Sequence, residues 1–83
     1  MQAGAREPRV DAAGVAAALR RAGIRDDLPG AGERRATIAE SAGVSTETLK
    51  RIEDGRTAVL DLDRADRILV AADGHISECE LVD

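Results

Sequence analysis

Few residues of this chain could carry out covalent or metal chemistry. It has one histidine, His75, and one cysteine, Cys79. Four residues apart on a helix, these two would form half of a metal site, but no second pair of ligands accompanies them. No Gly-rich turn or oxyanion site supports a nucleophile, and one histidine is little material for general-base catalysis. We therefore expect no enzyme activity, no cofactor and no metal ion.

Carboxylates dominate the C-terminal third of the chain. Residues 57–83 hold two arginines against seven Asp and Glu, so this segment is strongly acidic. Asp61, Asp63, Asp66 and Asp73 lie too far apart, with too few neutral oxygen ligands, for a calcium loop. We expect this surface to point away from any polyanion and to be available to a protein partner.

Residues 31–56 have no net charge, unlike the acidic segment 57–83, because their five Lys and Arg balance five Asp and Glu. The chain as a whole carries a net charge of −4, which argues against a nucleic-acid partner. A surface that binds a polyanion needs only local positive charge, however, and Lys50, Arg51 and Arg56 follow one another closely in this segment.

Periodic apolar positions predict four helices to carry these side chains. They span Val10 to Ala22, about Glu33 to Ala42, about Thr46 to Asp54, and Leu62 to Ala72. A chain of 83 residues forms one domain, and its apolar residues, 43% of the total, include no Phe, Tyr or Trp. The core must be built from small aliphatic side chains, so we expect a homodimer partner to add burial.

The ends of the predicted helices divide the chain into three segments. We expect a flexible arm over 1–9, a helical domain over 10–74 that ends at Gly74, and a tail over 75–83. Arg6 and Arg9 of the arm could reach a DNA backbone or minor groove, or simply be solvated. Thr57 to Leu60 is a linker that could be extended. The tail mixes apolar and acidic residues, which would suit an edge strand, a dimer contact or disorder.

A break at Gly43 divides the second predicted helix from the third. Gly43 can adopt the left-handed conformation that ends a helix, Val44 can fill the angle, and Ser45 can cap the next helix. The small Ala39 lets the third helix pass over the second, and Ile38, Leu49 and Ile52 supply a shared core. This arrangement is a helix-turn-helix.

The string I-A-E-S-A-G-V-S-T-E-T-L-K-R-I-E-D-G-R, from Ile38 to Arg56, resembles the lambda-repressor-like (Cro and Xre) DNA-binding family. The resemblance is strong over this stretch, moderate over Leu62 to Ala72, and weak over Val10 to Gly23. One departure is the loop from Ile24 to Gly32, which is longer than the family's usual connection and contains Pro29. The resemblance implies an all-α fold of about four helices that binds operator DNA as a dimer.

By the family's pattern, the helix at about 46–54 lies in the major groove. Thr46, Glu47 and Arg51 would then read bases, with Arg51 suited to guanine and Glu47 to cytosine N4 or simply to the helix dipole. The remaining implied contacts are to phosphates: Arg35, Lys50 and Arg56 as cations, and Ser45 and Thr57 through hydroxyls or nearby backbone N–H groups. The same cations could instead form an ordinary solvated face.

Other functions compete with a phage repressor, a Cro-like protein or a small bacterial regulator. The chain could be a protein-interaction module, such as an antitoxin whose acidic C-terminal part covers a basic toxin. It could also be a helix-turn-helix scaffold that has lost DNA binding. The unpaired cysteine favours a reducing compartment, and no signal peptide or membrane span is evident, so we expect a cytoplasmic protein.

Overall fold

A computed structural model describes residues 8–25 and 27–82 of the chain. The predicted arm therefore falls outside the described residues except for Pro8 and Arg9, and Arg6 is not placed. Pro8 and Arg9 are joined to the rest of the fold, because the carbonyl of Pro8 accepts a hydrogen bond from the Leu62 amide at 2.9 Å.

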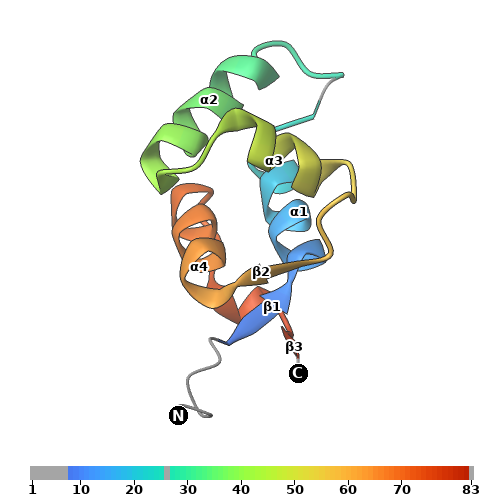
Figure 1. The fold of residues 1–83 in the computed structure, drawn as a ribbon. Helices are drawn as coiled ribbons and strands as arrows, with labels where there is room; N and C mark the ends of the chain where they lie inside the picture. The colour runs from blue at the N-terminus through green and yellow to red at the C-terminus, as the bar shows by residue number, and fades with distance from the viewer. Residues whose placement is uncertain (1–7, 26, 83) are drawn as a thin grey trace.

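The described chain is mostly helical, with a small sheet at one end (Figure 1). Its four α-helices are α1 (Ala12–Arg21), α2 (Ala31–Ala42), α3 (Thr46–Glu53) and α4 (Leu62–Ala71), followed by a short 3-10 helix, η2 (Ile76–Glu78). The three strands are β1 (Arg9–Asp11), β2 (Val59–Asp61) and β3 (Leu81–Val82). The prediction of four helices is confirmed, whereas an all-α description is only approximate because it leaves out the sheet.

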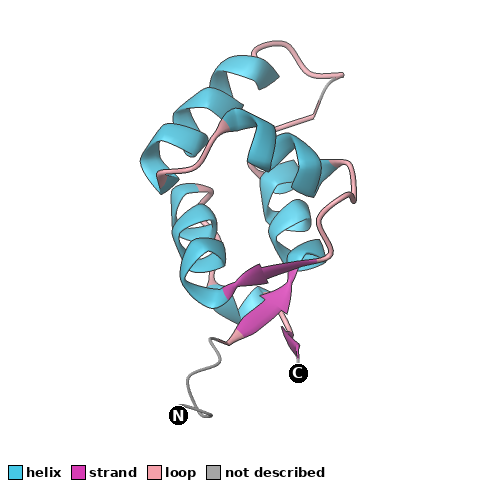
Figure 2. Cartoon of the chain, viewed as in Figure 1, coloured by secondary structure: helices cyan, strands magenta, loops and turns pink. Residues whose placement is uncertain are grey.

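The sheet is antiparallel in the order β2-β1-β3 and gathers segments from both ends of the chain (Figure 2). Val10 pairs with Leu60 on one side and with Leu81 on the other. The prediction that Val10 begins the first helix is therefore wrong. Asp11 is the N-cap of α1, and its carboxylate accepts from the Ala13 amide at 2.8 Å.

The core lies between the helices and one face of the sheet. It is aliphatic as expected, with Leu19, Ile24, Leu49, Ile52 and Leu69 among its largest fully buried side chains. Helix α2 packs on α4 and α3, while α1 packs on α3 and α4. The long connection between α1 and α2 thus leaves the first helix within the core.

Apolar spacing in the sequence predicts Ala13 among the inward positions of the first helix, and Leu62 but not Ile68 among those of the fourth, and these predictions are partly wrong. In α1, Ala13 is exposed and Ala12 and Ala16 are buried, because the helix begins two residues later than its apolar spacing suggested. In α4, Ile68 is fully buried and was missed, whereas Leu62 is only half-buried.

Helix α4 also ends differently from the prediction. Its last residue is Ala71, and the left-handed residue that follows is Asp73, with φ of 59°, instead of Gly74. The Gly74 amide donates to the Leu69 carbonyl at 2.7 Å. A Cβ at Gly74 would lie 2.8 Å from Glu78 Oε2 and 3.2 Å from Leu69 Cδ2, so a larger residue there would have to displace these two side chains.

Gly14, in the first turn of α1, has close neighbours as well. A Cβ there would lie 2.6 Å from the Glu78 carbonyl oxygen and 2.8 Å from Cys79 Sγ. From the sequence alone, a small residue at this position could let another helix approach closely. The neighbour is instead the C-terminal segment, which lies directly on α1.

Polar contacts fix that segment. The His75 amide donates to Glu78 Oε2 at 2.7 Å, and Arg21 of α1 forms an ion pair with Glu78 Oε1. The backbone hydrogen bond from His75, and then the one from Arg21, lower the pKa of Glu78. Burial raises the pKa of the Cys79 thiol, and the nearby carboxylates of Asp11 and Glu78 raise it further.

Candidate functional site

Helices α2 and α3 are joined by a tight turn over residues 43–45. Gly43 adopts φ of 72° and ψ of 31°, the left-handed conformation that the sequence predicted. The Val44 amide donates to the Ala39 carbonyl at 3.0 Å, and Ser45 Oγ accepts from the Thr48 amide at 3.1 Å. The predicted helix stop and N-cap are both confirmed.

Apolar residues hold the two helices against each other and against the rest of the core. Ile38 and Ala39 of α2 and Leu49 and Ile52 of α3 are all buried, as predicted, and Val44 is partly buried against the same core. Because Leu49 and Ile52 face inward, the opposite side of α3 is left exposed to solvent. Figure 1 shows α2 and α3 toward the end of the molecule opposite β1 and β3.

Three residues on the outer side of α3 were predicted to read bases, and the structure places them together there. Thr46, Glu47 and Arg51 are all exposed. Arg51 Nη2 lies 3.0 Å from Glu47 Oε2, and the two side chains are 58% and 72% exposed. Residues four apart on a helix are neighbours on its surface, which brings this pair into contact.

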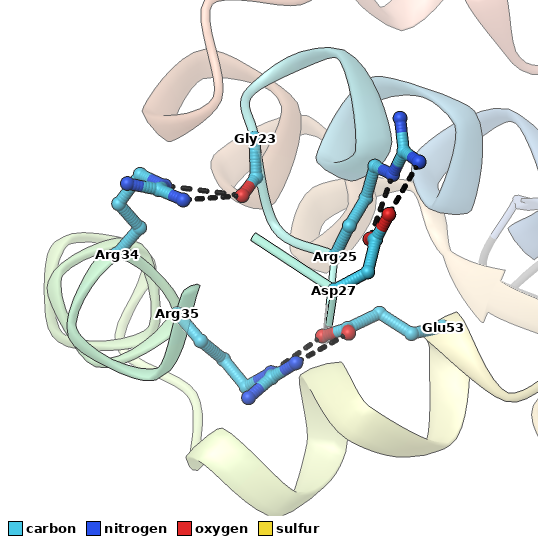
Figure 3. A network of polar contacts seen from close by, with 6 residues as sticks. All are labelled: Gly23, Arg25, Asp27, Arg34, Arg35 and Glu53. Atoms are coloured by element: carbon cyan, nitrogen blue, oxygen red, sulfur yellow. Dashed lines mark hydrogen bonds and ion pairs between the residues drawn. The ribbon is translucent and has the colours of Figure 1, made fainter. Parts of the chain in front are cut away.

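Arg35 occupies a different environment. Its Nε and Nη2 donate to the two carboxylate oxygens of Glu53 at 2.8 and 2.7 Å, and both side chains are only 12% exposed. This bidentate ion pair joins the first part of α2 to the last residue of α3 (Figure 3). A phosphate contact by Arg35 stays a prediction, while its contact with Glu53 gives it a structural role that the sequence did not reveal.

Arg34, the neighbour of Arg35, reaches toward the other side of α2 (Figure 3). Its Nε and Nη2 donate to the Gly23 carbonyl at 3.0 and 2.9 Å, and Nη2 also donates to the Pro29 carbonyl at 2.9 Å. Arg34 thereby ties both ends of the long connection to α2. Counting charge along the sequence could not distinguish this cation from a solvated one.

The other predicted contacts surround α3. Ser45 and Arg56 are exposed, whereas Lys50 and Thr57 are half-buried. Arg56 follows Gly55, whose φ of 75° turns the chain away from α3. A shallow depression of about 340 Å³ is lined by Gly32, Arg35, Thr46, Glu47 and Lys50. The fold therefore brings most of the predicted residues to α3 and the adjoining start of α2.

Residues 8–25 and 27–82 contain no group of three His, Cys, Asp or Glu side chains placed to hold a metal ion. Among the described helices, none has the length and apolar character required to cross a membrane.

Comparison with known proteins found no matching family model, no similar curated protein and no similar solved structure.

Proposed function

We propose that α2, the turn and α3 form a helix-turn-helix, and that the chain binds double-stranded DNA sequence-specifically with α3 in the major groove. The observation that carries this proposal is the outer face of α3. A short helix, anchored by Leu49 and Ile52, presents Thr46, Glu47 and Arg51 to solvent. Side chains of this kind can form hydrogen bonds with base edges.

The distribution of charge supports this orientation. Lys50, Arg51 and Arg56 belong to α3 and the residues that follow it, whereas Asp61, Asp63 and Asp66 lie in β2 and the first turns of α4. Cations beside α3 can neutralise phosphates and displace counterions. The carboxylates at the other end of the molecule then lie away from the duplex.

The protein would act as a small transcriptional regulator by occupying an operator. In this proposal it binds as a homodimer, since two copies of α3 about 34 Å apart would match successive major grooves on one face of B-DNA. A two-fold symmetric dimer would then select an operator with related half-sites.

The test is selection of bound sequences from a random duplex pool, followed by affinity measurements at several salt concentrations. We expect a recurring half-site, and a logarithm of affinity that falls with log salt at a slope of several units. Arg51→Ala should relax preference at one base pair per half-site. Arg64→Ala removes one positive charge from α4, where Arg64 lies near Asp61, and should leave base preference unchanged. Absence of duplex binding at low salt would overturn the proposal.

A second candidate is binding of a basic protein through the acidic part of the chain, as an antitoxin does. The observation that favours it is a groove of about 410 Å³ lined by Pro8, Leu62 and Ile76, with Asp63 and Asp66 beside these apolar side chains. An apolar floor flanked by carboxylates suits a cationic, partly apolar segment. This function predicts a basic toxin encoded beside this chain and a complex that survives high salt, without salt-sensitive duplex binding.

A further inference from the structure

We propose that Glu47 acts in recognition through Arg51: it is a positioning residue that holds the guanidinium in the orientation that binds one guanine. This inference rests on the proposed function and concerns how α3 would read its half-site. It assigns Glu47 a role other than direct recognition of a base. The observation behind it is the ion pair on the outer face of α3, where Arg51 Nη2 lies 3.0 Å from Glu47 Oε2.

The geometry of the pair favours a positioning role. Glu47 precedes Arg51 by four residues, which is the favourable order for an acid and a base on a helix. Because both side chains are more than half exposed, the pair contributes little to folding stability. Its main physical effect is to restrict the orientation of an otherwise freely rotating arginine.

The ion pair also leaves the guanidinium able to bind a base. An arginine carries five N–H donors, and Glu47 accepts from Nη2 of Arg51. Other N–H groups at the same end of the side chain are left for O6 and N7 of guanine. Arg35 is different, because its Nε and Nη2 are both bound to Glu53 in a mostly buried ion pair.

This arrangement accounts for a carboxylate on a surface that faces DNA. Alone, Glu47 would be repelled by phosphates, but beside Arg51 its charge is paired on the same face of the helix. A fixed arginine loses less conformational freedom when it binds guanine, so the carboxylate can increase selectivity without touching a base.

The experiment is a double-mutant cycle in which the measured quantity is the preference of each variant for one base over the others. The wild type, Glu47→Ala, Arg51→Ala and the double variant are titrated with duplexes substituted at each position of the selected half-site. The wild type should prefer guanine at the Arg51 position by about 5- to 150-fold, the range typical of a bidentate arginine contact. Glu47→Ala should reduce that preference at least threefold and change no other position. In the Arg51→Ala background, Glu47→Ala should alter no preference.

Two further variants isolate the cause. Glu47→Gln keeps an oxygen acceptor for Arg51 and should retain more of the guanine preference than Glu47→Ala. Asp63→Ala is the matched control, because Asp63 lies 3.7 Å from Arg67 in an ion pair of the same spacing on α4. It should leave every preference unchanged. Thermal unfolding of each variant checks that α3 is intact.

Two results would overturn the inference while leaving the proposed function standing. In the first, Glu47→Ala loses preference at a different base pair, and does so equally in the Arg51→Ala background, which would make Glu47 a direct reader. In the second, duplex binding is selective but Glu47→Ala leaves the guanine preference unchanged. If the wild type selects no duplex at all, the proposed function and this inference both fail.

Discussion

The two ends of this molecule are built in different ways. The α2–α3 region is one continuous stretch of 23 residues, 31–53, whose helices are adjacent in sequence. The sheet end gathers three short strands that begin at residues 9, 59 and 81. A unit made of neighbours in sequence carries its own structural signals, whereas a unit made of distant segments depends on the whole fold.

Ion pairs inside and outside the α2–α3 region also differ. Arg35 and Glu53 form a mostly buried bidentate ion pair within the α2–α3 region. Outside that region, Arg21 at the C-terminal end of α1 pairs with Glu78 of η2, and the Arg21 side chain is 58% exposed. Removing a charge should therefore cost much more at the first site than at the second.

The largest effect on the free energy of unfolding is expected from Glu53→Ala. It leaves the guanidinium of Arg35 without its carboxylate in a site where both side chains are 12% exposed. We expect the free energy of unfolding to fall by about 3 kcal/mol, as for other broken buried ion pairs. Urea denaturation followed by circular dichroism measures this change.

The matched control is Asp27→Ala, which breaks the exposed bidentate pair between Asp27 and Arg25. It should change the free energy of unfolding by less than about 1 kcal/mol. Replacing both residues of the buried pair, in Arg35→Met with Glu53→Leu, should recover much of the lost stability. Equal losses for Glu53→Ala and Asp27→Ala would contradict the expected difference between a mostly buried ion pair and an exposed one.

An intermediate effect on the free energy of unfolding is expected from substituting two glycines, Gly14 in α1 and Gly32 in α2. Gly14→Ala adds a methyl group 2.6 Å from the Glu78 carbonyl oxygen, so the C-terminal segment must move away from α1. We expect a loss of about 1 to 3 kcal/mol from overpacking, despite the better helix propensity of alanine. Gly32→Ala in α2 meets nothing within 4 Å and should raise stability by up to about 1 kcal/mol.

Thermal unfolding of the two glycine variants decides whether the C-terminal segment is held firmly on α1. Opposite signs are expected because both glycines lie in helices and only Gly14 has close neighbours. Stabilisation by both substitutions would mean that residues 78 and 79 move away easily.

The smallest effect on folding stability is expected from removing the charge of Glu78, and this effect depends on pH. Hydrogen bonds from His75 and Arg21 lower the pKa of Glu78 below its ordinary value of 4.5 in the folded protein. The folded state therefore binds fewer protons than the unfolded state in this range. The stability that Glu78 provides is fully present above pH 4.5 and is lost as the pH falls through the folded pKa.

Glu78→Gln measures this contribution. The wild type should unfold at a slightly higher temperature than Glu78→Gln at pH 7, and the difference should narrow below pH 4.5. A difference that is constant from pH 7 to pH 3 would show that the charge of Glu78 does not contribute.

Prediction from the sequence succeeded where the controlling residues are neighbours. Gly43 and Ser45 mark a helix end and a helix start by their own backbone and hydroxyl chemistry. Prediction failed at Val10, which lies in β1. Its helical spacing from the apolar residues of the Ala-rich stretch that follows indicated a helix instead. Prediction also failed at the end of α4, where Asp73 and not Gly74 takes the left-handed conformation.

For the candidate site, the sequence predicted which side chains belong to the outer face of α3, because helical spacing separates Thr46, Glu47 and Arg51 from Leu49 and Ile52. It did not predict what the arginines contact. The same residue type has three different partners. Arg34 donates to backbone carbonyls, Arg35 pairs with the mostly buried carboxylate of Glu53, and Arg51 pairs with the exposed carboxylate of Glu47.

By itself, the sequence determined four helices, an aliphatic core and the turn at Gly43, since each follows from spacing and backbone preference within a few residues. Only the tertiary structure decided that Val10 pairs with Leu60 and Leu81, that Arg35 meets Glu53, and that Gly14 lies against Glu78 and Cys79. The physical reason is that these contacts join segments far apart in the chain. Their geometry is fixed only when the helices pack around a common core.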